Sequence, residues 1–105
     1  MRYTLDLAME KLLHSLQEFI IFRRKFADKK ADSESAELAI LNDILLDLAG
    51  GIAIYAAHPD PGRLAKEIAA CHFTHELPRV FQKEGLERFL CPPYFSQTDL
   101  SRLSG

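Results

Sequence analysis

The chain has little of what would define several large classes of protein. Its 105 residues include two cysteines, too few for a disulfide framework, and 13 Lys and Arg against 15 Asp and Glu. The formal net charge of −2 therefore supplies no global basic field that would hold nucleic acid. We expect no signal peptide, because Asp6 and Glu10 stand where its apolar core would lie. These features predict a cytoplasmic protein in which Cys71 and Cys91 are reduced.

Long apolar runs and catalytic signatures are also missing. The most apolar region, residues 38–57, contains Asn42, Asp43 and Asp47, so we expect no segment that spans a membrane. The sequence has no phosphate-binding loop, dinucleotide-binding glycine pattern, nucleophile elbow or kinase motif, and it lacks the Glu-x-x-His pair of di-iron proteins. We therefore expect a protein that is not an enzyme.

Two long segments carry apolar residues at the spacing of amphipathic helices. In residues 4–27 and 34–57 these positions recur in steps of three and four, which predicts two helices that each bury a stripe. The polar stretch between them is short, so we expect an antiparallel αα-hairpin. The stripes consist of Leu5, Met9, Leu12, Leu16, Phe19 and Phe26 in the first segment and of Leu38, Leu41, Leu45, Leu48, Ile52 and Tyr55 in the second.

Two adjacent glycines, Gly50 and Gly51, lie inside the second helical segment. Together they cost about 2 kcal/mol relative to alanines in a helix interior. The small residues around them indicate that another backbone approaches closely there, within a helix that is continuous or kinked. The alternative is a break at residues 50–51 that leaves residues 51–57 as a separate helix or a short strand.

Prolines divide the rest of the chain. Pro59 stops the second helix, and Asp60 followed by Pro61 suits the start of a third. We expect that third helix over about residues 61–77, ending before Pro78.

Beyond Pro78 the pattern predicts short helical turns and then the proline-bounded stretch CPPYF. The expected fold class is all-α: a small helical bundle built on the long hairpin, the third helix and these turns. We expect a single domain over residues 1–95 and a loosely ordered C-terminal tail over residues 96–105.

The stretch ACHFTHELPRV combines a cysteine and two histidines. If the third helix runs through it, Cys71 and His75 are i, i+4 neighbours and could meet one ion. A zinc, iron or haem site would add Cys91 and either His72 or His58. The favoured interpretation is a buried helix end, because Cys71 continues an apolar stripe and the spacing matches no structural zinc pattern. A nucleophilic role is disfavoured, because Cys71 would lie near the negative end of the helix dipole.

A basic cluster with interleaved aromatic residues is the main candidate for a binding surface. A surface of this kind combines charge for orientation with apolar anchoring for affinity. The alternative interpretation is a solvated helix end. The predicted partner-binding residues are Phe22, Arg23, Arg24, Lys25, Phe26, Lys29 and Lys30 in the cluster, together with Tyr94 and Phe95 in CPPYF.

The first helical segment has more apolar surface than one narrow stripe, so we expect a homodimer with an intermolecular bundle of the first two helices. The function we predict is a non-enzymatic helical interaction module, such as a regulator, inhibitor or accessory subunit, that binds another protein without a cofactor. One alternative is a zinc-, iron- or haem-binding protein. A second is an accessory nucleic-acid binder that uses the basic cluster at residues 23–30.

Overall fold

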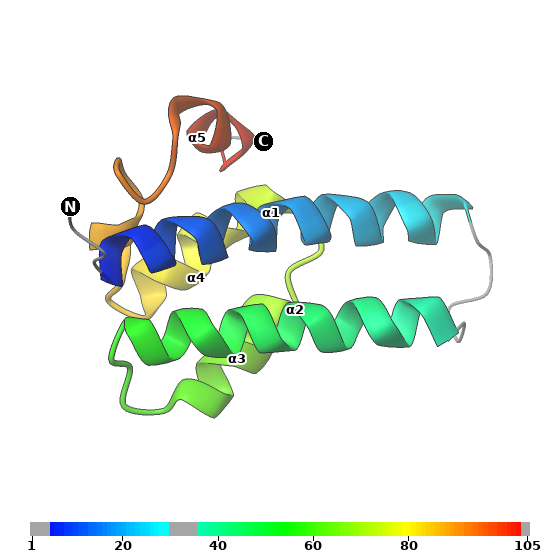
Figure 1. The fold of residues 1–105 in the computed structure, drawn as a ribbon, viewed down its shortest axis with the longest axis horizontal. Helices are drawn as coiled ribbons and strands as arrows, with labels where there is room; N and C mark the ends of the chain where they lie inside the picture. Colours follow the sequence, from blue (N-terminus) through cyan, green and yellow to red (C-terminus); the bar gives the residue numbers. More distant parts are fainter. Residues whose placement is uncertain (1–4, 30–35, 104–105) are drawn as a thin grey trace.

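The computed structural model describes residues 5–29 and 36–103, and over them the chain is a small all-α bundle, as predicted. Helices α1 (Leu5–Lys29) and α2 (Ala36–Tyr55) form the expected antiparallel hairpin (Figure 1). Shorter elements cover one side of this hairpin. They are α3 (Pro61–Ala69), the 3₁₀ turn η1 (Thr74–Glu76), α4 (Leu77–Lys83), the 3₁₀ turn η2 (Glu87–Phe89) and α5 (Gln97–Leu103).

The core lies where the hairpin meets the shorter helices. Leu13, Leu16 and Ile20 of α1 are at most 1% exposed, and so are Leu45 and Ile52 of α2. Leu12 and Phe19, which the sequence placed in the centre of the α1 stripe, are only partly buried. The buried side of α1 is therefore rotated from the expected stripe, because α1 packs against α2 on one flank and against the later elements on the other.

Helix α2 runs unbroken through its two glycines. A Cβ on Gly51 would lie 3.3 Å from Cδ1 of Leu12, whereas a Cβ on Gly50 would have nothing within 4 Å. The expected close approach of another backbone is therefore wrong. A leucine side chain of α1 packs over Gly51, and the space above Gly50 is open.

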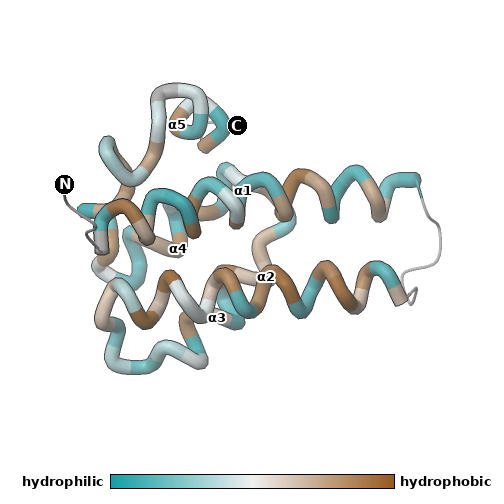
Figure 2. The backbone as a smooth tube through the Cα atoms, viewed as in Figure 1, coloured by the Kyte–Doolittle hydropathy of each residue, from teal (hydrophilic) through white to brown (hydrophobic). Residues whose placement is uncertain are grey.

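Helix α2 is apolar along most of its length (Figure 2). By length and composition residues Ala36–Tyr55 meet the criterion for a membrane span, contrary to the sequence expectation, and 33% of that window is buried within the bundle. Core helices of globular proteins meet the same criterion, so this composition alone is weak support for a membrane location.

The turn from α2 to α3 lies where Pro59 and the pair Asp60 and Pro61 predicted the end of one helix and the start of the next. Ala57 adopts a left-handed conformation with φ of 56°, and the amide of His58 donates to the carbonyl of Ala53, as in a Schellman helix end. Asp60 then caps α3 by accepting from the amide of Arg63 at 3.3 Å.

Helix α3 ends at Ala69, well short of the predicted residue 77. The chain continues through Cys71 and an extended Phe73, which has φ of −128° and ψ of 147°, before η1 and α4 begin. Polar contacts favour this early end. The guanidinium of Arg23 donates to the carbonyls of Ala69 and Cys71, at and just beyond the end of α3. The carboxylate of Glu76 accepts from the amides of His72 and Phe73 in the following segment.

The C-terminal segment differs from the loosely ordered tail that the sequence predicted. Residues 97–103 form helix α5, whose Asp99 is 4% exposed and lies 3.0 Å from the ring nitrogen Nδ1 of His14 on α1. Phe95 and Leu103 belong to the main core. These contacts dock residues 95–103 onto α1, so the folded unit extends beyond residue 95.

An ion network joins the α2–α3 turn to α3 and α4. The side chains of His58 and Glu84 are 7% and 8% exposed, and Nε2 of His58 lies 2.8 Å from Oε1 of Glu84. Arg63 Nη2 donates to the same oxygen at 2.7 Å. Because Nδ1 of His58 accepts from the amide of Asp60 at 3.0 Å, the imidazole proton resides on Nε2. The hydrogen bond from Arg63, with a further one from His58, lowers the pKa of Glu84 to about 2 despite its burial.

Glu84→Gln tests this network through the pH dependence of stability. A carboxyl whose pKa is lowered by folding stabilises the protein above its unfolded pKa, near 4.5, and loses that contribution as the pH falls toward about 2. We therefore expect the variant to be less stable than the wild type at neutral pH. The difference in melting temperature should shrink as the pH falls through that window, as measured by circular dichroism. A difference that stays constant across the window would contradict the assignment.

Gly50→Ala is expected to stabilise the protein by about 1 kcal/mol, because alanine is the better helix former and its Cβ meets open space. Gly51→Ala is the matched control. Its Cβ would press on Leu12 at 3.3 Å, so it should gain less or lose stability. Urea denaturation at low protein concentration measures both. Equal gains at the two positions would mean that Leu12 does not constrain Gly51.

Candidate partner-binding groove

A groove crosses the second half of α1, between the end of α3 and the segment that follows it. It consists of adjoining hollows of about 400, 190 and 410 Å³, and His72 lines all of them. Asp43 is the one carboxylate among the residues that line these hollows. We call this surface the basic groove after its cationic lining residues, which are Arg23, Arg24, Lys25, Lys66 and Arg102.

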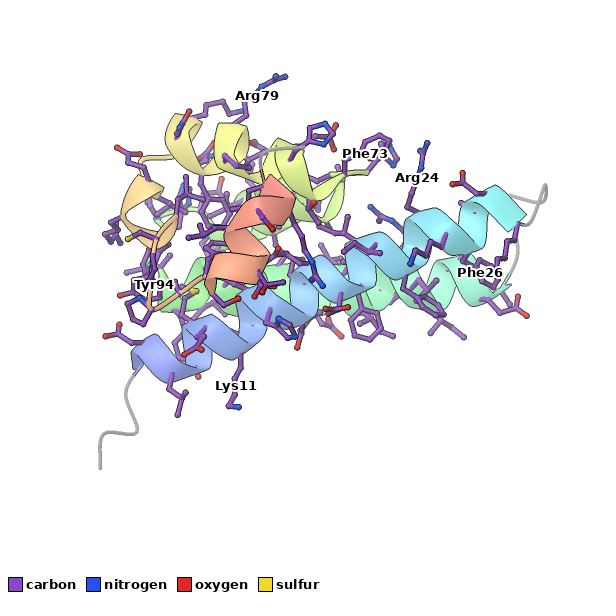
Figure 3. All side chains as sticks on the ribbon, turned by 90° about the horizontal axis from the view of Figure 1, so that it is seen from above. Lys11, Arg24, Phe26, Phe73, Arg79 and Tyr94 are labelled. Atoms are coloured by element: carbon purple, nitrogen blue, oxygen red, sulfur yellow. The ribbon has the colours of Figure 1, made fainter. Side chains whose placement is uncertain are left out.

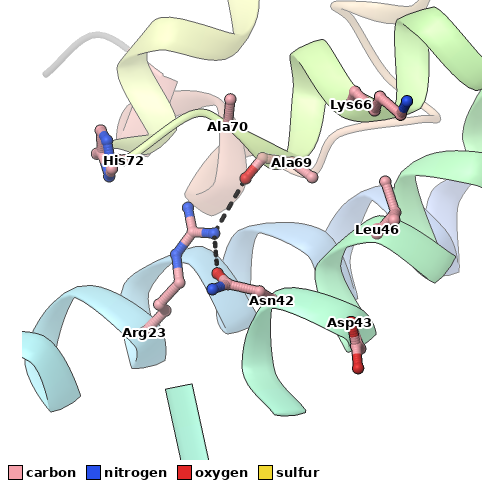
Figure 4. Close-up of a pocket in the computed structure, with 8 residues that line it drawn as sticks. All are labelled: Arg23, Asn42, Asp43, Leu46, Lys66, Ala69, Ala70 and His72. Carbon is pink, nitrogen blue, oxygen red and sulfur yellow. Dashed lines mark hydrogen bonds between the residues drawn. The ribbon is translucent and has the colours of Figure 1, made fainter. Parts of the chain in front are cut away.

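Arg23 forms the floor of the groove and is held within the protein (Figure 4). Its Nη1 donates to Oδ1 of Asn42 at 2.9 Å and to the carbonyl of Ala69 at 3.0 Å, and its Nη2 donates to the carbonyl of Cys71 at 2.6 Å. A guanidinium is well suited to the end of a helix, where carbonyls lack partners and the dipole is negative. Arg23 therefore ties α1 to α2 and to the end of α3.

Glu76 shapes the wall of the groove. Its Oε2 accepts from the amides of His72 and Phe73 at 2.6 and 3.0 Å. The backbone hydrogen bond from Phe73 has the largest effect in lowering the pKa of Glu76, and the one from His72 lowers it further. The segment from His72 to Glu76 is thus a closed turn that presents its side chains toward α1.

Arg24 and Phe73 meet across the groove. The Arg24 guanidinium lies 4.3 Å from the centre of the Phe73 ring, a cation–π geometry, and that ring also stacks on His75 with a centroid distance of 5.2 Å. Figure 3 shows Arg24 and Phe73 on the same side of the molecule. Phe73 remains 39% exposed, so the groove has an apolar element among its cations.

Helix α5 closes the far end of the groove. Thr74 Oγ1 donates to the carbonyl of Arg102 at 2.9 Å. The side chain of Arg102 lies 2.9 Å from Glu18 and 3.4 Å from Asp99, so its charge is partly neutralised. Sequence reasoning missed Arg102 because it assigned residues 96–105 to a loose tail, and no local pattern links this residue to α1.

The predicted partner-binding residues separate into distinct places. Arg24 and Lys25 line the groove, whereas Phe22 and Phe26 stack on each other at 6.5 Å beside Lys29 along another flank of α1. Lys25 lies between the two flanks and borders both. Lys30 lies outside the residues that the structure describes.

The aromatic pair of CPPYF lies near the start of α1, at the opposite end of that helix from the basic cluster. Tyr94 donates from its hydroxyl to Oδ1 of Asp6 at 2.7 Å and packs edge-on against Phe89. The prediction that Phe95 belongs to a partner-binding surface is wrong, since its side chain is fully buried. The last turns fold back onto the core, where a large aromatic ring gains more from burial than from exposure.

The residues proposed for a metal or haem site are not brought together. Because α3 ends before Cys71, Cys71 and His75 are not neighbours on one face of a helix, and that expectation is wrong. Cys71 is buried and Cys91 exposed, and their thiols donate to the carbonyls of Glu67 and Arg88. Within residues 5–29 and 36–103 no group of three or more His, Cys, Asp or Glu is placed to hold an ion. The geometry therefore gives this alternative no support.

Neither Cys71 nor His58 is prepared for catalysis. Burial, assisted by the charge of Glu76 and opposed by Arg23, raises the pKa of the Cys71 thiol to about 11. A thiol with so high a pKa is a poor nucleophile at neutral pH. Both ring nitrogens of His58 are already engaged, by Glu84 and by the amide of Asp60.

Comparison with protein-family models, curated proteins and solved structures finds no match to this chain. The class that the fold defines is a small all-α helical bundle. Any functional conclusion for it rests on its own residues.

Arg23→Ala should destabilise the protein by about 2–3 kcal/mol, because it leaves the carbonyls of Ala69 and Cys71 without a charged donor. Arg24→Ala removes the same charge from the same helix but only a cation–π contact with Phe73 and an exposed ion pair with Asp28 at 3.6 Å, so we expect a loss below about 1 kcal/mol. Urea unfolding of the two variants measures the difference. Similar losses would show that Arg23 does not hold α3 in place.

Proposed function

We propose that this chain is a non-enzymatic, cytoplasmic interaction module, acting as a regulator, inhibitor or accessory subunit, that binds another protein through the basic groove. The observation that carries the proposal is the charge of the lining. Arg24, Lys25 and Lys66 border the groove with Arg23 and Arg102, and Asp43 is the only acid among the lining residues. A chain with net charge −2 gathers positive charge here, which favours an acidic partner.

The shape of the groove supports an extended peptide segment as its occupant. The hollows adjoin one another in a row across α1, rather than forming one deep enclosed cavity, and His72 joins them. The apolar surface of Ile21 and Phe73 at one end offers an anchor for a hydrophobic side chain. An acidic segment that carries such a side chain would combine both interactions.

Nucleic acid is less well supported as the partner. Single strands are commonly held by aromatic rings on which bases stack. The aromatic ring that lines the groove, Phe73, already packs against Arg24 and His75, and these contacts compete with a base. The high pKa of Cys71 and the engaged nitrogens of His58 support a role other than catalysis.

Binding of a fluorescein-labelled peptide rich in glutamate with interspersed leucine and phenylalanine tests the proposal by anisotropy. We expect Arg24→Glu to weaken binding at least tenfold, because it reverses a groove charge (tenfold corresponds to about 1.4 kcal/mol). Arg79→Glu is the matched control. It makes the same charge change at an exposed position of α4, well away from Arg24 (Figure 3), and should alter affinity less than about twofold.

The peptide experiment has two contrary outcomes. Equal effects of Arg24→Glu and Arg79→Glu, or no binding at about millimolar peptide, would reject the groove as a binding site for acidic segments. A labelled single-stranded oligonucleotide in the same assay tests the nucleic-acid alternative. Tighter binding of the oligonucleotide, with affinity that falls linearly in log–log form with salt, would favour that alternative.

A further inference from the structure

Helix α2 carries a second stripe on its side away from the core. Asp43 of this stripe also lines the basic groove, and Gly50 and Ile54 border a hollow beside α3. Its members recur in alternating steps of four and three residues, the spacing of a helix-packing seam. Ile40 and Ile54 in this stripe are 58% and 69% exposed, and both are large apolar residues on the same side of α2. The stripe consists of Ala36, Ile40, Asp43, Asp47, Gly50 and Ile54.

Helix α1 carries a stripe in which lysines outnumber acids. It runs through Lys11, Glu18, Phe22, Phe26 and Lys29, with Lys25 beside it; Glu18 is paired with Arg102 at 2.9 Å, and Phe22 is 55% exposed. At 100° per residue, Lys11, Phe22 and Lys29 fall within about 20° of one another around the helix. Figure 3 shows Lys11 projecting from α1 on the side away from Arg24 and Phe73. This stripe is therefore distinct from the basic groove.

Both stripes lie on one broad face of the hairpin. In Figure 1, α3 and α4 lie behind α1 and α2, and no helix of the described residues covers the front face of the hairpin. Leu12 packs on Gly51, and Arg23 bonds Asn42, so the basic part of α1 lies level with the first half of α2 in the same hairpin. The open face thus has a basic aromatic edge along α1 and an acidic aliphatic edge along α2.

We propose that a second copy of this chain covers the open face, with α1 of each copy packed antiparallel on α2 of the other in a two-fold four-helix bundle. Charge selects this arrangement. Helix α2 contains Glu37, Asp43 and Asp47 and neither Lys nor Arg, whereas Lys11, Lys25 and Lys29 outnumber Glu18 in and beside the α1 stripe. A two-fold axis parallel to the helices places the basic edge of one copy over the acidic edge of the other, twice.

Packing α1 on α1 and α2 on α2 would instead oppose like charges along both seams. The two edges of the open face carry opposite charges, so a matching partner must present one acidic and one basic edge. A second copy of this chain presents both. Gly50 is compatible with the same interface. It lies in the α2 stripe beside a hollow that α3 also lines, and a Cβ there would meet nothing within 4 Å.

The proposal is independent of the proposed function but adds to it. The basic groove and the open face meet at Lys25 and Asp43, but Arg23, Arg24 and Phe73 of the groove lie outside the open face, so a dimer would leave that part of each groove accessible. Two linked sites allow a partner with repeated acidic segments to bind with higher avidity than one groove provides.

Charge reversal on each edge tests the interface. We expect wild-type protein to sediment as a dimer at about 100 µM, and the dimer dissociation constant to rise at least tenfold in both Lys25→Glu/Lys29→Glu and Asp43→Lys/Asp47→Lys. The variant with all four substitutions restores opposite charges between α1 of one copy and α2 of the other. Its dissociation constant should return to within about threefold of wild type. Sedimentation equilibrium and native mass spectrometry give the stoichiometry.

The controls separate the interface from the groove and from folding. Arg24→Glu/Arg79→Glu reverses two charges away from the open face and should leave the dimer unchanged within about twofold. Circular dichroism confirms that each variant retains its helices, as expected for exposed positions. A wild-type monomer at that concentration, a fourfold variant that fails to dimerise, or a dimer lost in the Arg24→Glu/Arg79→Glu control would each overturn the proposal. None of these outcomes bears on whether the groove binds an acidic peptide.

Discussion

The guanidinium of Arg23 is the interaction on which the arrangement of the other elements depends. It is the point where α1, α2 and the end of α3 are held together, through Asn42, Ala69 and Cys71. Because the carbonyls at the end of α3 have this donor, the helix can stop there and the chain can turn back along α1. The turn from His72 to Glu76, and with it the wall of the basic groove, follows from that early stop.

Helix α1 serves several surfaces at once because it is long and its neighbours cover only part of its circumference. One flank packs into the core through Leu13, Leu16 and Ile20. A second flank carries Arg24 toward Phe73, and a third presents Phe22 and its neighbouring lysines to solvent. Charges and aromatic rings that are mixed in the sequence are therefore sorted by helical rotation into separate surfaces. Buried polar groups elsewhere, such as His58 and Glu84, help to fix the later elements against this frame.

The candidate site was only partly predictable. Arg24 and Lys25 could be predicted because they belong to a run of basic residues, which the sequence alone shows. Arg23 belongs to the same run, but its neighbours in the sequence do not indicate that its side chain points toward Asn42 within the protein. His72, Phe73 and Lys66 join the groove by tertiary contact, and nothing in their spacing indicates a position beside α1. The interpretation of Cys71 and His75 as helical neighbours failed because it assumed that helical propensity alone decides where α3 ends.

The sequence by itself determined the class of the fold, the antiparallel hairpin and the turn at Pro59 to Pro61, because hydrophobic periodicity, proline geometry and capping act over a few residues. Tertiary structure decided the rest: the end of α3, the docking of α5, the burial of Phe95 and the separation of the basic groove from the open face. Each of these depends on contacts between residues far apart in the chain, such as Arg23 with Cys71 and His14 with Asp99. Such contacts outweigh local preference because a buried carbonyl or carboxylate must find a partner, wherever in the sequence that partner lies.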